Sequence, residues 1–436
     1  MAAVYSIENG VRRVLPYFHQ TKVYAKGRWL NQTVVDVLSK ELSYSRERLK
    51  RDIHQEQLYV VRTSKDGTEE VLHKGWDQLL DLKLRNKDLV LYTQHRHEPN
   101  VPHDTGYFDD ENCNHNSTFP SQCKTKMKIV YEDDEIMVID KPSGIPCHPV
   151  RKYNHNTILG IIKNETGLDF LHNCHRLDKG TSGILILAKT KGAASKYPRI
   201  IEREKKYTTK QYLARVEGDF PENEFMIRCP VFALNTADGR ILHSNNNILP
   251  TDTATVFKRV SYNKNLNQSI VMCTAVTGKM HQIRIHLRLT GHPIVNDLHY
   301  NNIRENNNVV LTLKNKIETA IYEILFAKYP HFKERLNVAD ATDNVVSTID
   351  LQLETEFKID PTITKLVDRL KQTKLQHLSS LKLNGDICEV CQQELVDDDL
   401  DLADQQIWLH SYQYSYVKDG DEIFNYKTAL PSWCNI

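Results

Sequence analysis

The stretch that most constrains the fold is an almost purely aliphatic run, Ile184 to Ala188, which directly follows a turn-prone segment. Five consecutive apolar residues are typical of a central strand that is buried on both faces, although a short buried helix would show the same run. Residues 180–183, Gly-Thr-Ser-Gly, require a tight bend of the backbone at the entry. The pattern favours a core built around a sheet.

Three charged residues stand at the mouth of this run: Arg176, Asp178 and Lys179. A carboxylate that is held rigidly and partly desolvated at such an edge is suited to act as a nucleophile or a base. Alternatively, Asp178 pairs with Arg176 or Lys179 and caps the turn. The local stretch leaves both interpretations open.

The length of the chain, 436 residues, predicts two domains or one core with large additions. No segment approaches the roughly 20 apolar residues of a membrane span, so no membrane partner is expected. Nine widely scattered cysteines indicate a reducing compartment rather than a disulfide framework. We expect a cytoplasmic protein, with a mitochondrial location as the second option because Arg12 and Arg13 lie near the start.

Positive charge is concentrated in the segment that contains the motif. The formal net charge of the chain is only +1. Residues 124–300 contain 26 Lys and Arg against 17 Asp and Glu, a net +9, whereas residues 381–436 contain 3 against 11, a net −8. A basic segment predicts a polyanionic partner such as RNA. A basic surface that is merely solvated is the alternative.

The first part of the chain, residues 1–97, has the pattern of a small α/β domain. Residues 33–42 predict a helix capped by Asn31 or Thr33, and residues 45–57 predict a second, basic helix. Strands are predicted at 58–61 and 88–93. The order resembles a small RNA-binding module, with a generic α/β cap as the alternative. Polar residues 98–125 predict a linker.

Four spaced stretches resemble the signatures of RluA-type pseudouridine synthases. They are "IVYEDDEIMVIDKPSGIPCHP" (129–149), "HRLDKGTSG" (175–183), "KQYLARVEG" (210–218) and "TGKMHQIRIHLRLTGHPIVND" (277–297). The resemblance implies an α+β fold with a central, mostly antiparallel sheet. The catalytic domain would span residues 126–436, with an insertion at about 301–400.

The resemblance makes Asp178 the catalytic carboxylate. Converting uridine to pseudouridine breaks the N1–C1′ bond and joins C5 to C1′, and an anionic oxygen would attack the sugar or the base, or stabilise a cationic sugar. Tyr212 would stack on the uracil ring and serve in removing the C5 proton, unless it is a core aromatic. Arg284 would pair with Asp178, unless it contacts a phosphate.

The same resemblance assigns further residues to the RNA. Arg176 would take the place of the flipped base, or form a structural ion pair. Lys210 and His281 would shape the pocket or meet phosphates. Two positions depart from the family pattern: Lys279 stands where arginine is frequent, and Asn296 where glycine is usual, which predicts a left-handed asparagine in that turn.

No cofactor or metal is expected. The reaction exchanges no electrons, and the sequence has no phosphate-binding loop of the ATP type. Cys388 and Cys391 form a C-x-x-C motif without a second pair at zinc spacing, which leaves a structural metal only as the alternative.

The beginning of the chain and the stretch around the C-x-x-C motif resemble the branch of the family that modifies the anticodon stem-loop of tRNA at position 31 or 32. We therefore expect a tRNA pseudouridine synthase with tRNA as its partner and no obligate protein partner. The alternatives are a synthase for ribosomal or messenger RNA, and a non-catalytic RNA-binding or folding factor. An intact Asp178, Tyr212 and Arg284 argue against the last of these, because binding alone needs no carboxylate.

Overall fold

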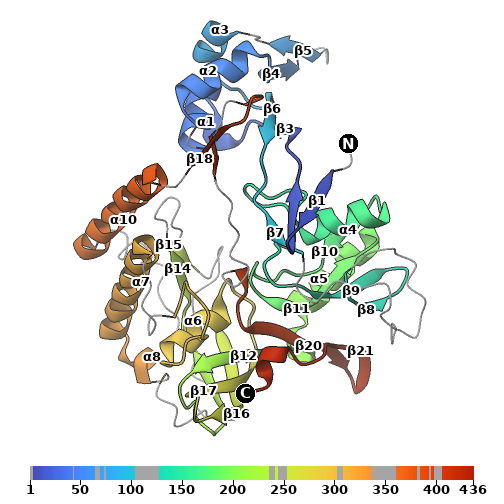
Figure 1. The fold of residues 1–436 in the computed structure, drawn as a ribbon, viewed down its shortest axis with the longest axis vertical. Helices are drawn as coiled ribbons and strands as arrows, with labels where there is room; N and C mark the ends of the chain where they lie inside the picture. The colour runs from blue at the N-terminus through green and yellow to red at the C-terminus, as the bar shows by residue number, and fades with distance from the viewer. Residues whose placement is uncertain are drawn as a thin grey trace. The chain divides into compact units, whose positions relative to one another are not determined.

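The computed structural model describes residues 3–42, 44–63, 69–72, 75–103, 127–234, 241–243, 253–301, 308–334, 336, 360–380, 383–391, 394–396 and 405–436. The chain divides into two compact units (Figure 1). The larger unit takes residues 1–13, 99–385 and 395–436, and the smaller unit takes residues 14–98 and 386–394. The smaller unit therefore contains a short piece from far along the chain. None of the described helices is both long and apolar enough to cross a membrane.

A ten-stranded sheet forms the centre of the larger unit. Its main path runs β13-β16-β17-β12-β20-β11-β9-β8, with β10 on β11 and β21 on β20. Strands β11 and β20 run parallel, and the other described pairs are antiparallel. This confirms the predicted α+β class with a mostly antiparallel sheet. The strands are β8 Ile129–Glu132, β9 Ile136–Lys141, β10 His172–Asn173, β11 Ser182–Ala188, β12 Thr208–Glu217, β13 Phe225–Arg228, β16 Ala254–Asn263, β17 Gln268–Ala275, β20 Leu409–Lys418 and β21 Asp421–Lys427.

Strand β11 is buried along its whole length because helices cover both faces of the sheet there. Leu185 and Leu187 pack with helix α4 (Ile158–Thr166). Ile184 and Ile186 point to the other face and pack with helix α5 (Lys191–Arg203). Alternate side chains of a strand point to opposite faces, so a strand covered on both sides must be apolar at every position. The aliphatic run is thus a strand and not a short helix.

Gly183 is required by the close approach of β20. A Cβ at Gly183 would lie 2.2 Å from the backbone oxygen of Ser411, and the φ angle of Gly183 is +104°. Only glycine adopts this conformation without strain and leaves room for the neighbouring backbone. The turn before β11 and the start of β20 are therefore fixed against each other.

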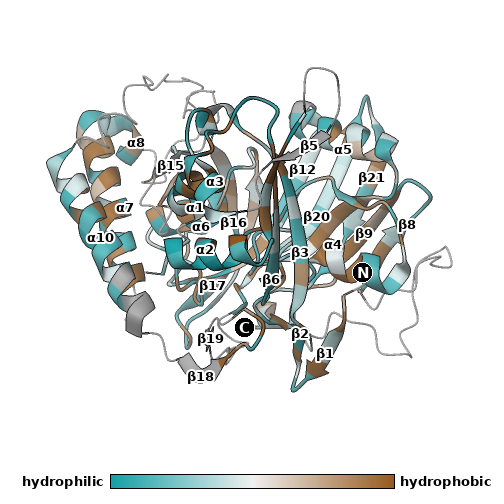
Figure 2. Ribbon diagram, turned by 90° about the horizontal axis from the view of Figure 1, so that it is seen from above, coloured by the Kyte–Doolittle hydropathy of each residue, from teal (hydrophilic) through white to brown (hydrophobic). Residues whose placement is uncertain are grey.

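The described helices of the insertion pack into the core of the larger unit. Leu313, Ile317 and Ile321 of α7 (Val309–Lys328) are buried in the same apolar cluster as Phe257 of β16. Teal and brown bands alternate along α7 and α10 in Figure 2, as expected for helices with one apolar face. The remaining helices of this unit are α6 Gln282–Leu289, α8 Pro330–Glu334 and α10 Pro361–Ser380.

Three further small sheets are described, two in the larger unit and a third whose strands run across the boundaries of residues 386–394. Strands β1 (Tyr5–Glu8), β2 (Val11–Val14) and β7 (Val101–Pro102) form one, β14 (Phe232–Leu234) and β15 (Ile241–His243) the second, and β18 (Leu383–Ile387) and β19 (Glu394–Val396) the third. Of the predicted linker, residues 98–103 contain β7, and residues 104–125 lie outside the described part of the chain.

The smaller unit is an antiparallel sheet in the order β3-β6-β4-β5 with three short helices packed on it. The two predicted helices and two predicted strands are present as α1, α2, β4 and β6. Thr33 caps α1, since its hydroxyl accepts a hydrogen bond from the amide of Asp36 at 3.1 Å. The elements are β3 Tyr17–Tyr24, α1 Val34–Leu42, α2 Arg46–His54, β4 Leu58–Thr63, β5 Glu69–Leu72, α3 Trp76–Asp81 and β6 Leu89–Arg96.

Candidate active site

An arginine shared between two carboxylates forms the centre of the site. Asp178 lies in the turn before β11, Arg284 in α6, and Asp297 in the loop after α6. Arg284 Nη1 donates to Asp178 Oδ2 at 2.9 Å, while its Nε and Nη2 donate to the two oxygens of Asp297 at 2.7 and 2.9 Å. A planar guanidinium presents donors on two edges and can hold both acids, which a lysine could not do.

Burial and charge act in opposite directions on Asp178. Burial disfavours the carboxylate, but interactions with the basic side chains around it, His281, Arg284 and Arg176, together with the hydrogen bond from Arg284, outweigh burial and hold the pKa of Asp178 below its usual range. Burial lowers the pKa of His281 itself to about 4, although Asp178 opposes this. His281 is therefore neutral at pH 7, and Arg284 provides most of the stabilising charge. Asp178 is an anion at physiological pH.

The second carboxylate anchors the arginine. Asp297 is 1% exposed, and Arg284 is 3% exposed. Burial again disfavours the charged acid, and Arg284 outweighs it and lowers the pKa of Asp297. Two carboxylates and one guanidinium leave the cluster with one net negative charge. Because Asp297 holds Arg284 through two hydrogen bonds, the position of the single bond to Asp178 is fixed.

His281 lies beside Asp178 in a left-handed conformation, with a φ angle of +57° at the start of α6. Its Nε2 is 3.6 Å from Asp178 Oδ2, and its Nδ1 hydrogen-bonds the hydroxyl of Tyr300 at 2.7 Å. Gln282 holds this turn through its side chain, which accepts from the amide of Lys279 at 3.1 Å and donates to the carbonyl of Ala254 at 2.8 Å. The imidazole is thus directed toward the catalytic carboxylate predicted from the sequence.

A buried lysine braces the turn that carries Asp178. Lys141 is fully buried, and its Nζ donates to the carbonyls of Pro142, Lys179 and Thr181 at 2.8, 3.1 and 2.8 Å. The hydroxyl of Ser143 donates to the carbonyl of Gly180. The Lys-Pro-Ser-Gly segment at the end of β9 therefore supports the backbone that directly follows the candidate catalytic acid.

An open pocket of about 300 Å³ lies over Asp178. This volume is at the lower end of the range for small-ligand sites, about 300–1,000 Å³. The wall is contributed by the turn before β11, by β12, by the start of α6 and by β20. Its lining includes Arg176, Asp178, Tyr212, Thr277, His281 and Leu409.

Tyr212 enters this pocket from β12 at a bulge. The pairing of β12 with β20 shifts register between Gln211 and Tyr212, and bulges are frequent beside active sites because they redirect a side chain. Burial raises the pKa of Tyr212 to about 12, and the charge of Asp178 adds to the effect. The phenol is therefore protonated at neutral pH. Arg176 is exposed at the pocket mouth.

Lys210 is placed differently from the other predicted residues. It is 8% exposed, and its Nζ lies 5.8 Å from the centre of the Tyr414 ring. Lys210 is not among the described residues that line the pocket. Its Nζ would be 3.8 Å from a Cβ on Gly278, a pocket residue, so the lysine lies behind the wall.

The predicted left-handed conformation of Asn296 is wrong, because Asn296 is not among the described residues with a positive φ angle. Its side chain instead fixes a neighbouring segment of the chain. The amide nitrogen donates to the carbonyl of Gln406 at 3.1 Å, and the amide oxygen accepts from the backbone of Trp408 at 2.8 Å. Asparagine thus positions the chain that leads into β20.

A second hollow of about 560 Å³ adjoins the pocket. It shares Arg176, Asp178 and Arg284 with the first and extends toward Arg151 and Lys314. Lys314 belongs to α7, which means that the insertion contributes to this surface. The arrangement offers a small pocket for one group and a wider basic surface beside it.

Sequence reasoning missed two residues of the site. Asp297 is the last residue of the fourth stretch, and nothing in the sequence placed it in the site. Arg284, which binds it, was predicted to form an ion pair with Asp178 alone. Lys141 lies in the loop of the first stretch, where its burial could not be seen. Among the described residues, one group of candidate metal ligands is present, and all of its members belong to the smaller unit.

Comparisons with known proteins agree with this geometry. Residues 135–289 match the family described as RNA pseudouridylate synthase. The chain is 30% identical to the tRNA pseudouridine(31) synthase of Saccharomyces cerevisiae over 98% of this chain and 96% of that protein. It is 32% identical to the mitochondrial tRNA pseudouridine(32) synthase of the same yeast, over 98% of this chain and 78% of that protein. The solved structure of human RNA pseudouridylate synthase domain containing 4 has a TM-score of 0.38 at 18% identity, and the match covers 70% of this chain and 90% of that chain.

Proposed function

The chain belongs to the RNA pseudouridylate synthase family and is an isomerase, and from this premise we propose that it converts a uridine of the tRNA anticodon stem-loop, at position 31 or 32, to pseudouridine. The two yeast relatives, which the chain matches over nearly its whole length, support this choice of substrate. The observation that carries the chemistry is the ionised Asp178 at the floor of a pocket of about 300 Å³.

Asp178 has one oxygen available for the substrate. Its hydrogen bond from Arg284 and its contact with His281 both fall on Oδ2. No described residue donates a hydrogen bond to Oδ1. In our proposal Oδ1 is the catalytic oxygen, while Arg284, itself held by Asp297, keeps the carboxylate charged and oriented.

The pocket would receive a single flipped nucleotide. A uridine in an RNA stack must leave it before its N1–C1′ bond is accessible, and it is extruded into a pocket for this purpose. The ring of Tyr212 then packs on the uracil. The N1–C1′ bond breaks, the base turns, C5 bonds to C1′, and the C5 proton leaves while N1 gains a proton. No oxidant or reductant is needed for this balance.

Arginines at the rim would hold the RNA. Arg176 and Arg151 are exposed and line the wider hollow beside the pocket. We assign Arg176 to the space that the flipped base leaves in the stem-loop, and Arg151 to a backbone phosphate. Lys210 lies behind the wall, and we assign it to shaping the pocket.

We propose that the smaller unit binds RNA through exposed basic side chains of helix α2. Arg48 and Arg51 of α2 contact the buried Asp52, with Nε–Oδ2 and Nη2–Oδ1 distances of 3.6 and 3.1 Å. Arg46 and Lys50 of the same helix are exposed. The exposed pair is the better candidate for phosphate contacts, because the other two stabilise the fold of the unit.

We place the protein in the cytoplasm, with mitochondria as a second location. Seven described cysteines form no disulfide, which suits a reducing compartment. The mitochondrial yeast relative supports the second location. Microscopy of a fluorescent fusion, with fractionation of the untagged protein, distinguishes the two.

The test of the function is a chemical map of pseudouridine across all tRNAs in cells with and without this protein. We expect the loss of a single modification at position 31 or 32, restored by the intact chain and not by Asp178→Asn. The purified protein should form the same pseudouridine in an unmodified transcript. Loss confined to ribosomal or messenger RNA would overturn the choice of tRNA while leaving the chemistry in place.

A further inference from the structure

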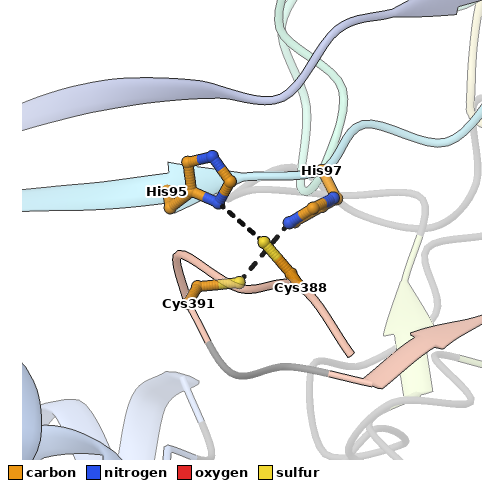
Figure 3. A group of neighbouring side chains, drawn as sticks. All are labelled: His95, His97, Cys388 and Cys391. Carbon is orange, nitrogen blue, oxygen red and sulfur yellow. Dashed lines mark hydrogen bonds between the residues drawn. The ribbon is translucent and has the colours of Figure 1, made fainter. Parts of the chain in front are cut away.

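Two histidines and two cysteines from distant parts of the chain meet in the smaller unit. His95 is the last residue but one of strand β6, and His97 directly follows the strand, while Cys388 and Cys391 belong to a turn 293 residues further along (Figure 3). The Sγ of Cys388 is 3.5 Å from His95 Nδ1, and the Sγ of Cys391 is 3.4 Å from His97 Nε2. All four ligand atoms lie within 4.8 Å of one another.

These distances are those of a tetrahedral zinc site. With Zn–S bonds of about 2.3 Å and Zn–N bonds of about 2.0–2.1 Å, ligand atoms at the corners of a tetrahedron lie about 3.4–3.8 Å apart. Both sulfur–nitrogen distances fall in this range. The most widely spaced pair needs to close by at most about 1.4 Å to reach the same geometry.

We propose that His95, His97, Cys388 and Cys391 bind one structural zinc ion. Two thiolates and two imidazoles are a standard zinc set, and softer ligands of this kind disfavour magnesium and calcium. Four protein ligands close the coordination sphere, so this ion would hold structure and would take no part in the isomerisation. Neutral imidazole is the form of histidine that binds metal.

Each pair of ligands is prearranged by its local structure. Residues two apart along a strand point to the same side, so His95 and His97 face one way, with ring centres 4.9 Å apart. Cys388 follows β18, and Cys391 ends the turn after it. The backbone amides of Val390 and Cys391 hydrogen-bond the sulfur of Cys388. Such amides facing a sulfur are suited to a metal-bound thiolate.

The ion would fasten residues 386–394 to the sheet of the smaller unit. Cys391 is 8% exposed, and with Val390 it adjoins a narrow hollow that is also lined by Arg48, Arg51 and Asp52 of helix α2. The turn thus packs beside the basic helix. Zinc would set the position of this turn without contributing to the pocket around Asp178.

The direct test is the metal content of the full-length protein, purified without chelators and measured by elemental analysis. We expect about one zinc ion per chain. Cys388→Ser and Cys391→Ser should each lose most of this zinc, whereas Cys434→Ser, which changes a cysteine outside the cluster, should retain it. The measurement is independent of RNA modification, so it succeeds or fails separately from the proposed function.

A second pair of variants guards against misfolding. His97→Ala should lose zinc, whereas His97→Cys should keep it, because three cysteines and one histidine also form a closed zinc site. Cobalt bound in place of zinc should show the visible spectrum of a tetrahedral ion with thiolate ligands. A zinc-free wild-type chain that takes up no cobalt would overturn the proposal. A Cys388–Cys391 disulfide in freshly purified protein, or zinc retained by Cys388→Ser, would also overturn it.

Discussion

The larger and the smaller unit each contain a cluster of partly or fully buried polar side chains, and the two clusters differ in the charges of their members. In the larger unit, Asp178, Arg284 and Asp297 have opposite charges and close on one another at 2.7–2.9 Å. In the smaller unit, the two histidines and two cysteines all offer electron pairs, and they approach at 3.4–3.5 Å. The charged groups of the first cluster attract one another without an added ion. The four donors of the second cluster need a cation to hold them together.

This contrast indicates different roles. A carboxylate held by a fixed cation keeps its charge and presents a free oxygen to a substrate, which suits a catalytic role. Four protein ligands that fill the coordination sphere leave no open position for a substrate, which suits a structural role. The two clusters should therefore respond differently to mutation and to pH.

The largest effect is expected for Asp178→Asn. The amide preserves the shape of the side chain but removes the anion, and we expect the single-turnover rate to fall by more than about 10⁴-fold. Affinity for tRNA should stay within about 3-fold, since the RNA contacts lie elsewhere. Stability must be measured in parallel, because Arg284 loses one charged partner. Substantial activity of a folded Asp178→Asn protein at saturating enzyme would remove the carboxylate from the mechanism.

A smaller effect is expected for Asp297→Asn, which loosens the anchor of Arg284. We expect the single-turnover rate to fall by about 10- to 100-fold and the free energy of unfolding to drop by about 3 kcal/mol, because one partner of a buried ion pair is lost. Denaturant unfolding measures the second quantity. Asp219→Asn is the control: its carboxylate pairs with Arg259 but is 60% exposed, so the cost should be below about 1 kcal/mol. Equal effects of the two substitutions would contradict the role of Asp297.

Cys391→Ser should have a still smaller effect on function, confined to binding. We expect tRNA affinity to weaken by about 3- to 10-fold, because the turn beside α2 loses its anchor. The single-turnover rate at saturating enzyme should stay within about 2-fold. Cys434→Ser serves as the matched variant in a filter-binding titration. A loss of rate with unchanged affinity would mean that the two clusters are not independent.

The smallest effect is expected from pH, which should leave the rate unchanged between about pH 5 and 8. The folded-state pKa of Asp178 lies below its ordinary value, so the carboxylate stays ionised across this range. The stability that Asp178 and Asp297 contribute is present above the pKa of an unfolded aspartate, about 3.9, and is lost as pH falls through their lower folded values. A rate that titrated near pH 6.5 would implicate a histidine with an ordinary pKa instead.

Local patterns predicted much of the larger unit. The aliphatic run predicted β11, and the four stretches predicted the family, which the comparisons confirm. The predicted pairing of Arg284 with Asp178 is present. The strand depends on residues close together in sequence, whereas the pairing joins residues 106 apart and was predicted only through the resemblance of the motifs to the family.

The remaining features depend on contacts between distant segments. The C-x-x-C motif appeared to lack a second pair of ligands, because His95 and His97 lie 293 and 294 residues away from the cysteines they contact. Asp297 was missed because nothing in the spacing shows that one arginine serves two acids. A histidine pair at the end of a strand was the available signal, and it gained meaning only when the fold brought the cysteines beside it.

The position of β20 in the central sheet has a consequence for synthesis on the ribosome. This strand lies between β12 and β11 and joins the two halves of the sheet, yet it is translated long after both. It also contributes Leu409 to the pocket that holds Asp178 and Tyr212. Until residue 418 has left the exit tunnel, the two halves cannot be hydrogen-bonded through this strand. We therefore expect a nascent chain that already carries Asp178, the proposed catalytic acid, to lack the complete pocket until translation has passed the insertion.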